Sequence, residues 1–224
     1  MAGASEEYYG DACEGTVILL VSGPPPRYIG ATGMGWLLNP RAGARAGAIV
    51  ASGMRWAADN DCYQGLNRSA YITMLGRVAT ADRSRLLFVV APDVVADAGA
   101  TLLRFKLWRP TLDHYALPIA FVAQDGQENR VVPWDAIRCL FIGGSTHWKL
   151  GRHARRLIAD AKDRGKWVHV GRVNTLRRMW LFSSIGVDSF DGTAFSKLPD
   201  KFIPWMLRRL PAQQHVMEEL LWDG

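Results

Sequence analysis

Residues 186–193 read Gly-Val-Asp-Ser-Phe-Asp-Gly-Thr, and this stretch decides the fold because it predicts a short strand directly after a helix-like run at 175–185. The predicted strand carries two acids, Asp188 and Asp191, three residues apart. Strand side chains alternate with a period of two, so the two carboxylates are expected on opposite faces. A carboxylate at the carboxyl end of a strand in a β/α protein commonly takes part in chemistry. Asp191-Gly192 is also a common turn pair, and a turn alone remains the alternative.

The same alternation of helix and short apolar strand extends through most of the chain. Besides the Asp191 segment, the predicted strands are 16–21, 86–90, 118–122, 137–142 and 166–170. The predicted helices are 69–80, 95–108, 148–164 and 175–185. Continuously apolar strands that alternate with helices are typical of a parallel sheet covered on both faces. Six or seven such units favour an α/β chain with a compact (β/α)8 TIM-barrel-like fold over an open doubly wound sheet.

The remaining segments complete a single predicted domain over residues 1–224, a length that suffices for one core. Residues 1–15 are expected to be a loose leader, and 201–224 two C-terminal helices broken near Pro211. The Gly- and Arg-rich stretch 27–47 is predicted to be a basic loop, followed by broken extended structure at 48–58.

The amino-acid composition limits the classes of partner and the cellular compartment that we expect. The formal net charge of +6 and the pI of about 9.5 favour a polyanionic partner. Cys13, Cys62 and Cys139 are far apart, which indicates neither a zinc site nor a disulfide framework and fits a reducing, cytoplasmic setting. The apolar run 16–21 is too short to cross a bilayer, and the acids before it do not suit a signal peptide. No membrane association is expected.

Polar residues follow the apolar strands, and a barrel would gather all of them at one mouth. They are Asp59 to Gln64, Asp93, Gln124-Asp125-Gly126, Gly143-Gly144, His169, Arg172 and Asp191. Each has a structural alternative. Asp93 can cap the helix that starts near Val95, and Gln124-Asp125-Gly126 can be only a turn. Gly143-Gly144 can serve tight packing or bind phosphate, and His169 can be a buried histidine with satisfied hydrogen bonds.

Five of these motifs, taken in order, resemble those of the tRNA-guanine transglycosylases. Residues 59–64, Asp-Asn-Asp-Cys-Tyr-Gln, are similar to that family's Asp-Ser-Gly-Gly-Tyr-Gln, and residues 123–126, Ala-Gln-Asp-Gly, to its Val-Gln-Gly-Gly. Ile-Gly-Gly at 142–144, Val-Gly at 170–171 and Gly-Val-Asp-Ser-Phe-Asp at 186–191 resemble its three later motifs. The runs 141–146, 165–169 and 188–193 look closest to a short, phage-borne branch that is linked to inserting 7-deazaguanine bases into DNA.

The resemblance implies roles for individual residues. Asp191 would be the nucleophile, and Asp59 the general acid/base. Asp93, Gln124, Gly143, Gly144, Tyr63 and His169 would bind the base. The tRNA enzymes carry a Cys-rich zinc subdomain near the C-terminus, and this chain has no residues for one and is much shorter. We therefore expect no metal and no cofactor, and a DNA rather than a tRNA substrate. Asp61-Cys62 replaces a Gly-Gly pair, which leaves the shape of that loop open.

A basic surface around the mouth would hold the nucleic acid. The predicted contacts are Arg152, Arg155, Arg156, Lys166, Arg172, Arg177 and Arg178. The implied partners are DNA, double- or single-stranded, and a free 7-deazaguanine base such as preQ0, with a homodimer or a partner subunit left open. The setting would be the cytoplasm, or the host's cytoplasm for a phage protein. Two alternatives remain: an N-glycosidase that uses the same carboxylates with water as acceptor, and a non-catalytic barrel that binds nucleic acid or a deazapurine.

Overall fold

A computed structural model of the chain describes residues 17–42 and 46–204, and within them eight parallel strands close into a barrel. The strands are β1 (Ile18–Val21), β2 (Met34–Leu38), β3 (Arg55–Ala58), β4 (Leu86–Val90), β5 (Ile119–Ala123), β6 (Cys139–Ile142), β7 (Trp167–Val170) and β8 (Ser189–Asp191). Neighbours in sequence are neighbours in the barrel, and β8 pairs with β1 to close it. The predicted TIM-barrel fold is confirmed.

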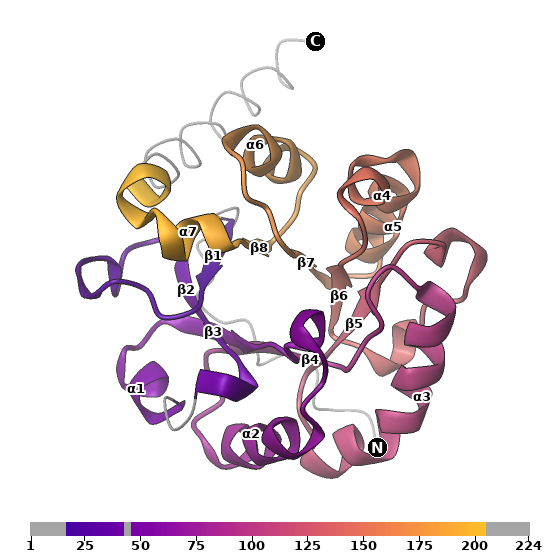
Figure 1. Cartoon of the computed structure of the whole chain (residues 1–224), viewed down its shortest axis with the longest axis horizontal. Helices are drawn as coiled ribbons and strands as arrows, with labels where there is room; N and C mark the ends of the chain where they lie inside the picture. Colours follow the sequence, from indigo (N-terminus) through magenta and orange to yellow (C-terminus); the bar gives the residue numbers. More distant parts are fainter. Residues whose placement is uncertain (1–16, 43–45, 205–224) are drawn as a thin grey trace.

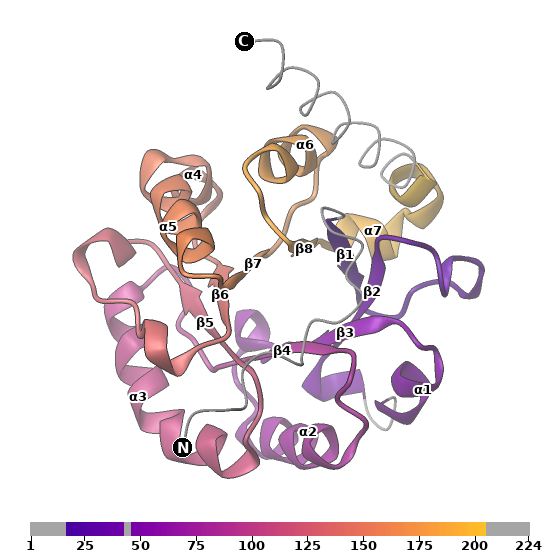
Figure 2. The same cartoon turned by 180° about the vertical axis from the view of Figure 1, so that it is seen from behind.

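Helices form a ring around the strands (Figures 1 and 2). They are α1 (Ala46–Ala51), α2 (Arg68–Thr80), α3 (Ala98–Tyr115), α4 (Thr146–Leu150), α5 (Arg152–Asp163), α6 (Leu176–Ser184) and α7 (Thr193–Lys197). Apolar side chains on the outer face of the strands pack against this ring. A second, smaller cluster that includes Leu20, Phe88 and Val122 fills the interior of the barrel. The two clusters follow from the alternation of side chains along each strand.

The prediction for residues 27–58 was wrong at β2 and α1 and right for the extended residues of β3. The expected basic loop contains β2, whose apolar residues are largely buried, and the expected extended stretch is the end of α1 followed by β3. Gly35 explains why a strand there was not recognised, because glycine weakens a strand pattern. A Cβ at Gly35 would lie 2.6 Å from Leu20 Cδ2 and 2.8 Å from the carbonyl oxygen of Arg55, so the packed barrel leaves no room for a side chain.

Two helix boundaries also differ from the expectation. The helix expected from Val95 begins at Ala98, and Asp97, not Asp93, is its N-cap: its side chain accepts from the Ala100 N–H. The single helix expected over 148–164 is two helices, α4 and α5, which meet at Gly151. Asp93 is therefore free of a capping role. The predicted leader 1–15 lies outside the described residues, as do the predicted C-terminal helices beyond residue 204.

Candidate active site

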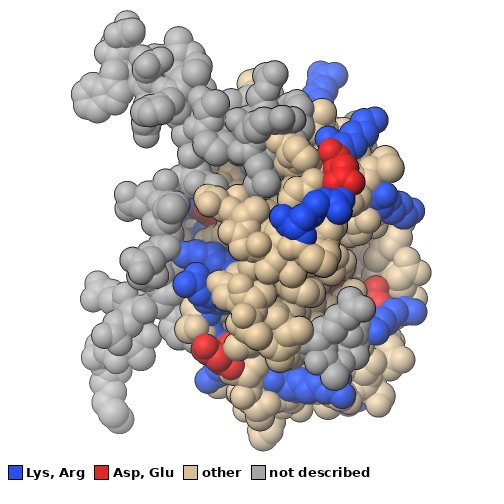
Figure 3. Space-filling view, turned by 90° about the vertical axis from the view of Figure 1, so that its left-hand side faces the viewer, with Lys and Arg blue, Asp and Glu red and all other residues tan. Residues whose placement is uncertain are grey.

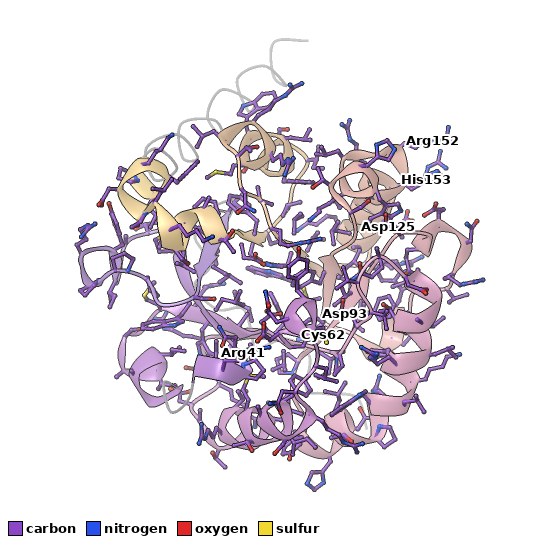
Figure 4. The ribbon with its side chains drawn as sticks, viewed as in Figure 1. Arg41, Cys62, Asp93, Asp125, Arg152 and His153 are labelled. Carbon is purple, nitrogen blue, oxygen red and sulfur yellow. The ribbon has the colours of Figure 1, made fainter. Side chains whose placement is uncertain are left out.

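A cavity of about 480 Å³ opens at the carboxyl ends of the barrel strands. The loops after β3, β4, β5, β6, β7 and β8 all contribute side chains to it. The residues that were predicted from the sequence and line this cavity are Asp59, Tyr63, Asp93, Gln124, Gly143, Gly144, Arg172, Arg178 and Asp191. In Figure 4, Asp93 lies toward the centre of the barrel, as expected for this position. The fold thus brings together carboxylates that are 132 residues apart in the sequence, Asp59 and Asp191.

Asp191 is the last residue of β8, and its carboxylate is held on both oxygens. Oδ2 lies 3.0 Å from Nε2 of His169, and Oδ1 accepts from the backbone N–H of Arg172 at 3.0 Å. Asp188 lies on the other side of the strand, where it accepts from Lys162 Nζ on α5 and from the Val168 N–H. The predicted opposite orientation of the two acids is confirmed. A carboxylate has about four acceptor positions, so Asp191 retains capacity for a ligand.

His169 lies beneath Asp191 and is fully buried. Nδ1 is 2.9 Å from Ser189 Oγ, which also accepts from the indole N–H of Trp167 at 2.8 Å. A hydroxyl has one donor and two acceptor positions, so Ser189 can accept from Trp167 and still either donate to Nδ1 or accept from it. Nε2 faces the carboxylate of Asp191, which can only accept when ionised, so His169 is the donor in that contact. The rings of Phe88 and Phe141 pack on either side of the imidazole, with centroids 5.1 and 4.5 Å away.

This position revises the role predicted for His169. Its side chain is absent from the cavity wall, and both ring nitrogens are occupied within the protein, so it cannot contact a base. The sequence carried only part of this signal. Trp167 and His169 are two residues apart, as are Ser189 and Asp191, so each pair shares one face of its strand. The register that sets His169 opposite Ser189 is given only by the folded barrel.

Asp59 follows β3 and faces the same cavity in a different electrostatic environment. Burial, and to a smaller extent the negative charge of Asp191, raise the pKa of this carboxyl to about 7, while a hydrogen bond from the Asn60 backbone opposes the rise. The two acids are thus within electrostatic reach of each other. A carboxyl with a pKa near neutrality can give and take a proton at physiological pH.

Asp93 and Gln124 form a buried polar network at the cavity wall. The carboxylate of Asp93 accepts from Asn60 Nδ2 at 2.7 Å and from Gln124 Nε2 at 2.6 Å. Gln124 Oε1 accepts from the N–H groups of Ala96 and Gly144. Burial raises the pKa of Asp93, and the hydrogen bonds from Asn60 and Gln124 oppose that rise. Gln124 thus orients Asp93 and retains one amide N–H for a ligand, while Asn60 is a site residue that the sequence reading did not single out.

The two glycines after β6 are required by the protein's own packing. A Cβ at Gly143 would lie 2.7 Å from Val122 Cγ1 and 2.9 Å from Gln124 Nε2. Gly144 has a φ of +72°, and a Cβ there would meet Asp125 and Trp148. Tight packing, the structural alternative for this pair, therefore accounts for the absence of side chains at both positions.

Tyr63 and Arg172 form part of the rim. The guanidinium carbon of Arg172 lies 4.6 Å from the centroid of the Tyr63 ring, and its Nη2 donates to the Gly144 carbonyl at 2.7 Å. Asp61 has a φ of 56°, a left-handed conformation that glycine adopts readily and aspartate tolerates. It also forms an ion pair with Arg41. The loop therefore has a left-handed residue at the position where the resembling motif carries glycine.

Lys149 was not predicted, yet it lies next to the site. Only 4% of its surface is exposed, and its ammonium donates to the Gly171 carbonyl at 2.6 Å. Burial, and to a smaller extent the charge of Arg172, lower the pKa of Lys149 to about 8, whereas the charge of Asp191 opposes the change. Lys149 lies between Trp148 and Leu150 in a helical stretch, and nothing in that pattern distinguishes it from a surface lysine.

The predicted nucleic-acid contacts do not form one surface. Arg172 and Arg178 line the cavity, and Arg177 is exposed on α6. The arginines of α5 at 152, 155 and 156 are exposed, and Figure 4 shows Arg152 at the periphery of the molecule. Lys166 precedes β7, and its ammonium donates to the Ile137 carbonyl at the amino end of the barrel, opposite the cavity. Lys166, one of the predicted nucleic-acid contacts, therefore lies at the end of the barrel away from the cavity.

Other surface features are less specific. On the face shown in Figure 3, Lys and Arg side chains are spread over the surface rather than gathered in one stripe. Among residues 17–42 and 46–204 there is no cluster of three or more His, Cys, Asp or Glu side chains that could hold a metal ion. In the same part of the chain, no helix is long and apolar enough to span a membrane.

Comparison with known proteins adds two distant similarities in backbone. No family model and no curated protein matches the chain. Among solved structures, one similar chain is the PaMucR phosphodiesterase in complex with c-di-GMP, with a TM-score of 0.43, 12% identity and coverage of 67% of this chain and 65% of that one. Another is a putative glycerophosphoryl diester phosphodiesterase from Silicibacter pomeroyi DSS-3, with a TM-score of 0.43, 13% identity and coverage of 78% and 56%. The chain spans less than two thirds of each, and similarity at this level says nothing about the reaction.

Proposed function

We propose that this protein is a transglycosylase that exchanges guanine in DNA for a 7-deazaguanine base of the preQ0 type through a covalent aspartyl-glycosyl intermediate. The observation that carries the proposal is the pairing of Asp59 and Asp191 at one cavity in unlike environments. Asp191 is held by two N–H donors, while burial and the charge of Asp191 raise the pKa of Asp59 to about 7. A carboxyl group whose pKa is raised to about 7 can serve as the acid/base beside a second carboxylate that serves as the nucleophile.

In the first step, a carboxylate oxygen of Asp191 attacks C1′ of the target nucleotide. The bond from C1′ to the guanine nitrogen breaks, its electron pair goes to the base, and protonated Asp59 supplies a proton to the departing guanine. The products are free guanine, an ester between Asp191 and C1′, and an ionised Asp59. His169 donates to Oδ2 of Asp191 throughout, which fixes the orientation of the carboxylate.

In the second step, ionised Asp59 removes a proton from the ring nitrogen of the incoming deazaguanine. That nitrogen attacks C1′, the ester bond breaks, and its electron pair returns to Asp191. Asp59 is again protonated, so the cycle closes without a cofactor. The carboxylate of Asp93 and the remaining N–H of Gln124 supply an acceptor and a donor for the edge of the base.

A cavity of about 480 Å³ lies within the range of sites that enclose small molecules, and the target nucleotide would have to leave the base stack to reach it. The formal net charge of +6 suits a polyanionic substrate. Together with the ordered resemblance of the motifs, these properties favour a nucleic acid over a free nucleoside.

The direct test is to incubate the protein with DNA and isotope-labelled preQ0 and then to analyse the nucleosides by mass spectrometry. The wild-type protein is expected to incorporate the label and to release guanine. Asp191→Asn is expected to reduce incorporation by at least about a thousandfold, because the isosteric amide cannot form the ester. Asp82→Asn, an exposed acid remote from the cavity, serves as the matched control.

Two outcomes would redirect the assignment. Guanine release without incorporation would identify an N-glycosidase that uses the same carboxylates with water. Binding of DNA or preQ0 without release or incorporation, indifferent to Asp191→Asn, would indicate a non-catalytic binding barrel.

A further inference from the structure

A second cavity, of about 700 Å³, lies beside the first and is formed by the loops after β3 and β4 with the adjoining parts of α2 and α3. We name it the α2–α3 groove. It shares Tyr63, Asp93 and Val95 with the catalytic cavity. Because the two cavities have wall residues in common, they are adjacent, and a strand that places one nucleotide in the first cavity passes close to the second.

Two arginines and a tryptophan form the outer part of the groove. Arg104 donates through Nη1 to the backbone carbonyl of Asp93 at 2.6 Å, which fixes the guanidinium at the groove wall. The guanidinium carbon of Arg68 lies 5.4 Å from the centroid of the Trp108 ring. Both cations are thereby held in place before a ligand binds, which reduces the entropy lost on binding.

The groove carries little opposing charge. Asp93 is the only acid among the residues described as lining it, and its two carboxylate oxygens accept from Asn60 and Gln124 in the buried network. Arg68 and Arg104 therefore leave the groove with an excess of positive charge. A guanidinium has five N–H donors in a planar fork that matches phosphate geometry. Of these, the hydrogen bond to Asp93 accounts for one in Arg104.

We propose that the α2–α3 groove binds the sugar–phosphate backbone of the strand next to the exchanged nucleotide, with Arg68 and Arg104 contacting phosphate oxygens. This inference rests on the proposed function, which supplies the nucleic acid and places its reacting nucleotide in the neighbouring cavity. Arg68 and Arg104 take the place of the contacts that were expected from the sequence. The α5 arginines lie at the periphery, and Lys166 lies at the opposite end of the barrel.

The test measures binding of a fluorescently labelled single-stranded DNA at several salt concentrations. Arg68→Gln and Arg104→Gln are each expected to weaken binding several-fold and to lower the slope of log affinity against log salt by about 0.7, the value for one phosphate contact on a single strand. Arg85→Gln removes the same charge from an exposed side chain just before β4, at the opposite end of the barrel, and is expected to leave the slope unchanged.

Arg104→Gln also removes a hydrogen bond to the Asp93 carbonyl, and this loss can disturb Asp93 itself. Arg68→Gln has no such side effect, because no hydrogen bond from Arg68 supports a catalytic loop in the described residues. The Arg68 variant therefore keeps the test decisive. Salt slopes equal to that of the wild type in both variants would overturn the groove assignment. If the protein still incorporates preQ0 in that case, the proposed reaction stands. Conversely, an arginine-dependent slope without base exchange would support the groove and refute the reaction. A wild-type protein that binds no nucleic acid would refute both.

Discussion

Asp59 and Asp191 are the same residue type, and their surroundings give them different chemistry. Asp191 receives N–H donors from His169 and Arg172. Asp59 is largely shielded from solvent and faces the charge of Asp191, so its pKa is raised to about 7. The sequence pointed to both acids through the ordered resemblance of the motifs that contain them. It could not predict the raised pKa of Asp59, which depends on loops that meet only in the folded barrel.

Replacing Asp59 should stabilise the protein at alkaline pH. The folded state holds the Asp59 proton up to about pH 7, whereas the unfolded chain releases it near pH 4. Stability therefore falls as pH rises through this window, and the full penalty is present above it. Asp59→Asn is expected to raise stability at pH 8 by about 1–3 kcal/mol, with little effect at pH 4. Thermal unfolding at the two pH values measures this, and an equal shift at both would contradict it.

The charge of Asp191 is the second cause of the raised Asp59 pKa, so removing that charge should lower the pKa. In Asp191→Asn, the carboxyl of Asp59 is expected to titrate at a lower pH than in the wild type, while burial keeps its pKa above that of an exposed aspartate. NMR titration of the labelled side-chain carboxyl measures the change directly. Asp82→Asn should leave the titration where it is, and an unshifted Asp59 in Asp191→Asn would mean that the two acids do not interact.

At the scale of elements, short continuously apolar strands such as β4 and β5 were recognisable because both of their faces are buried. β2 was not recognised, because Gly35 interrupts its apolar run and Gly and Arg residues surround it. The network below the site was also beyond the sequence. This network is the chain of hydrogen bonds that runs from Trp167 through Ser189 and His169 to Asp191. It depends on the register between β7 and β8.

The turn after β7 should be sensitive to a single methyl group. A Cβ at Gly171 would lie 2.6 Å from Cε1 and 2.8 Å from Cζ of Phe141, and 3.6 Å from Oδ2 of Asp191. Phe141 packs on His169, so a displaced ring would disturb the histidine that orients the nucleophile. Gly171→Ala is expected to cost about 1–3 kcal/mol of stability, as overpacking does, and to lower base exchange at least about tenfold.

A double-mutant cycle with Phe141→Leu provides the control for this prediction. The smaller side chain relieves the contact with the added methyl group, so the double variant should be more stable than the sum of the two single changes implies. Chemical denaturation of the four proteins measures the coupling free energy. Strict additivity would show that Gly171 is not limited by Phe141.

At the scale of the whole molecule, the closed parallel barrel places a charged residue at one end or the other according to which end of a strand it adjoins. Residues that follow a strand reach the mouth, as Asp59 and Arg172 do, and residues that precede one lie at the far end, as Lys166 does. This rule was available from the sequence, and applying it would have excluded Lys166. By contrast, the α2–α3 groove depends on how two helices and two loops pack side by side, which no single segment encodes.

Closure also makes the barrel interior intolerant of added volume. Gly35 on β2 lies between β1 and β3, and a Cβ there would lie 2.6 Å from Leu20 Cδ2 and 2.8 Å from the Arg55 carbonyl oxygen. Relief would require two strands to separate, which strains the entire ring. Gly35→Ala is expected to cost about 1–3 kcal/mol, or a fall in Tm of roughly 2–12 °C for a domain of this size.

Gly76→Ala is the matched control, because a Cβ at Gly76 in α2 would meet no atom within 4 Å. The same substitution there should raise stability by up to about 1 kcal/mol through improved helix propensity. Calorimetric unfolding of both variants compares one added methyl group inside the ring with one outside it. A Tm for Gly35→Ala equal to or above that of the wild type would mean that the interior can expand, and that closure does not constrain the position of the catalytic strands.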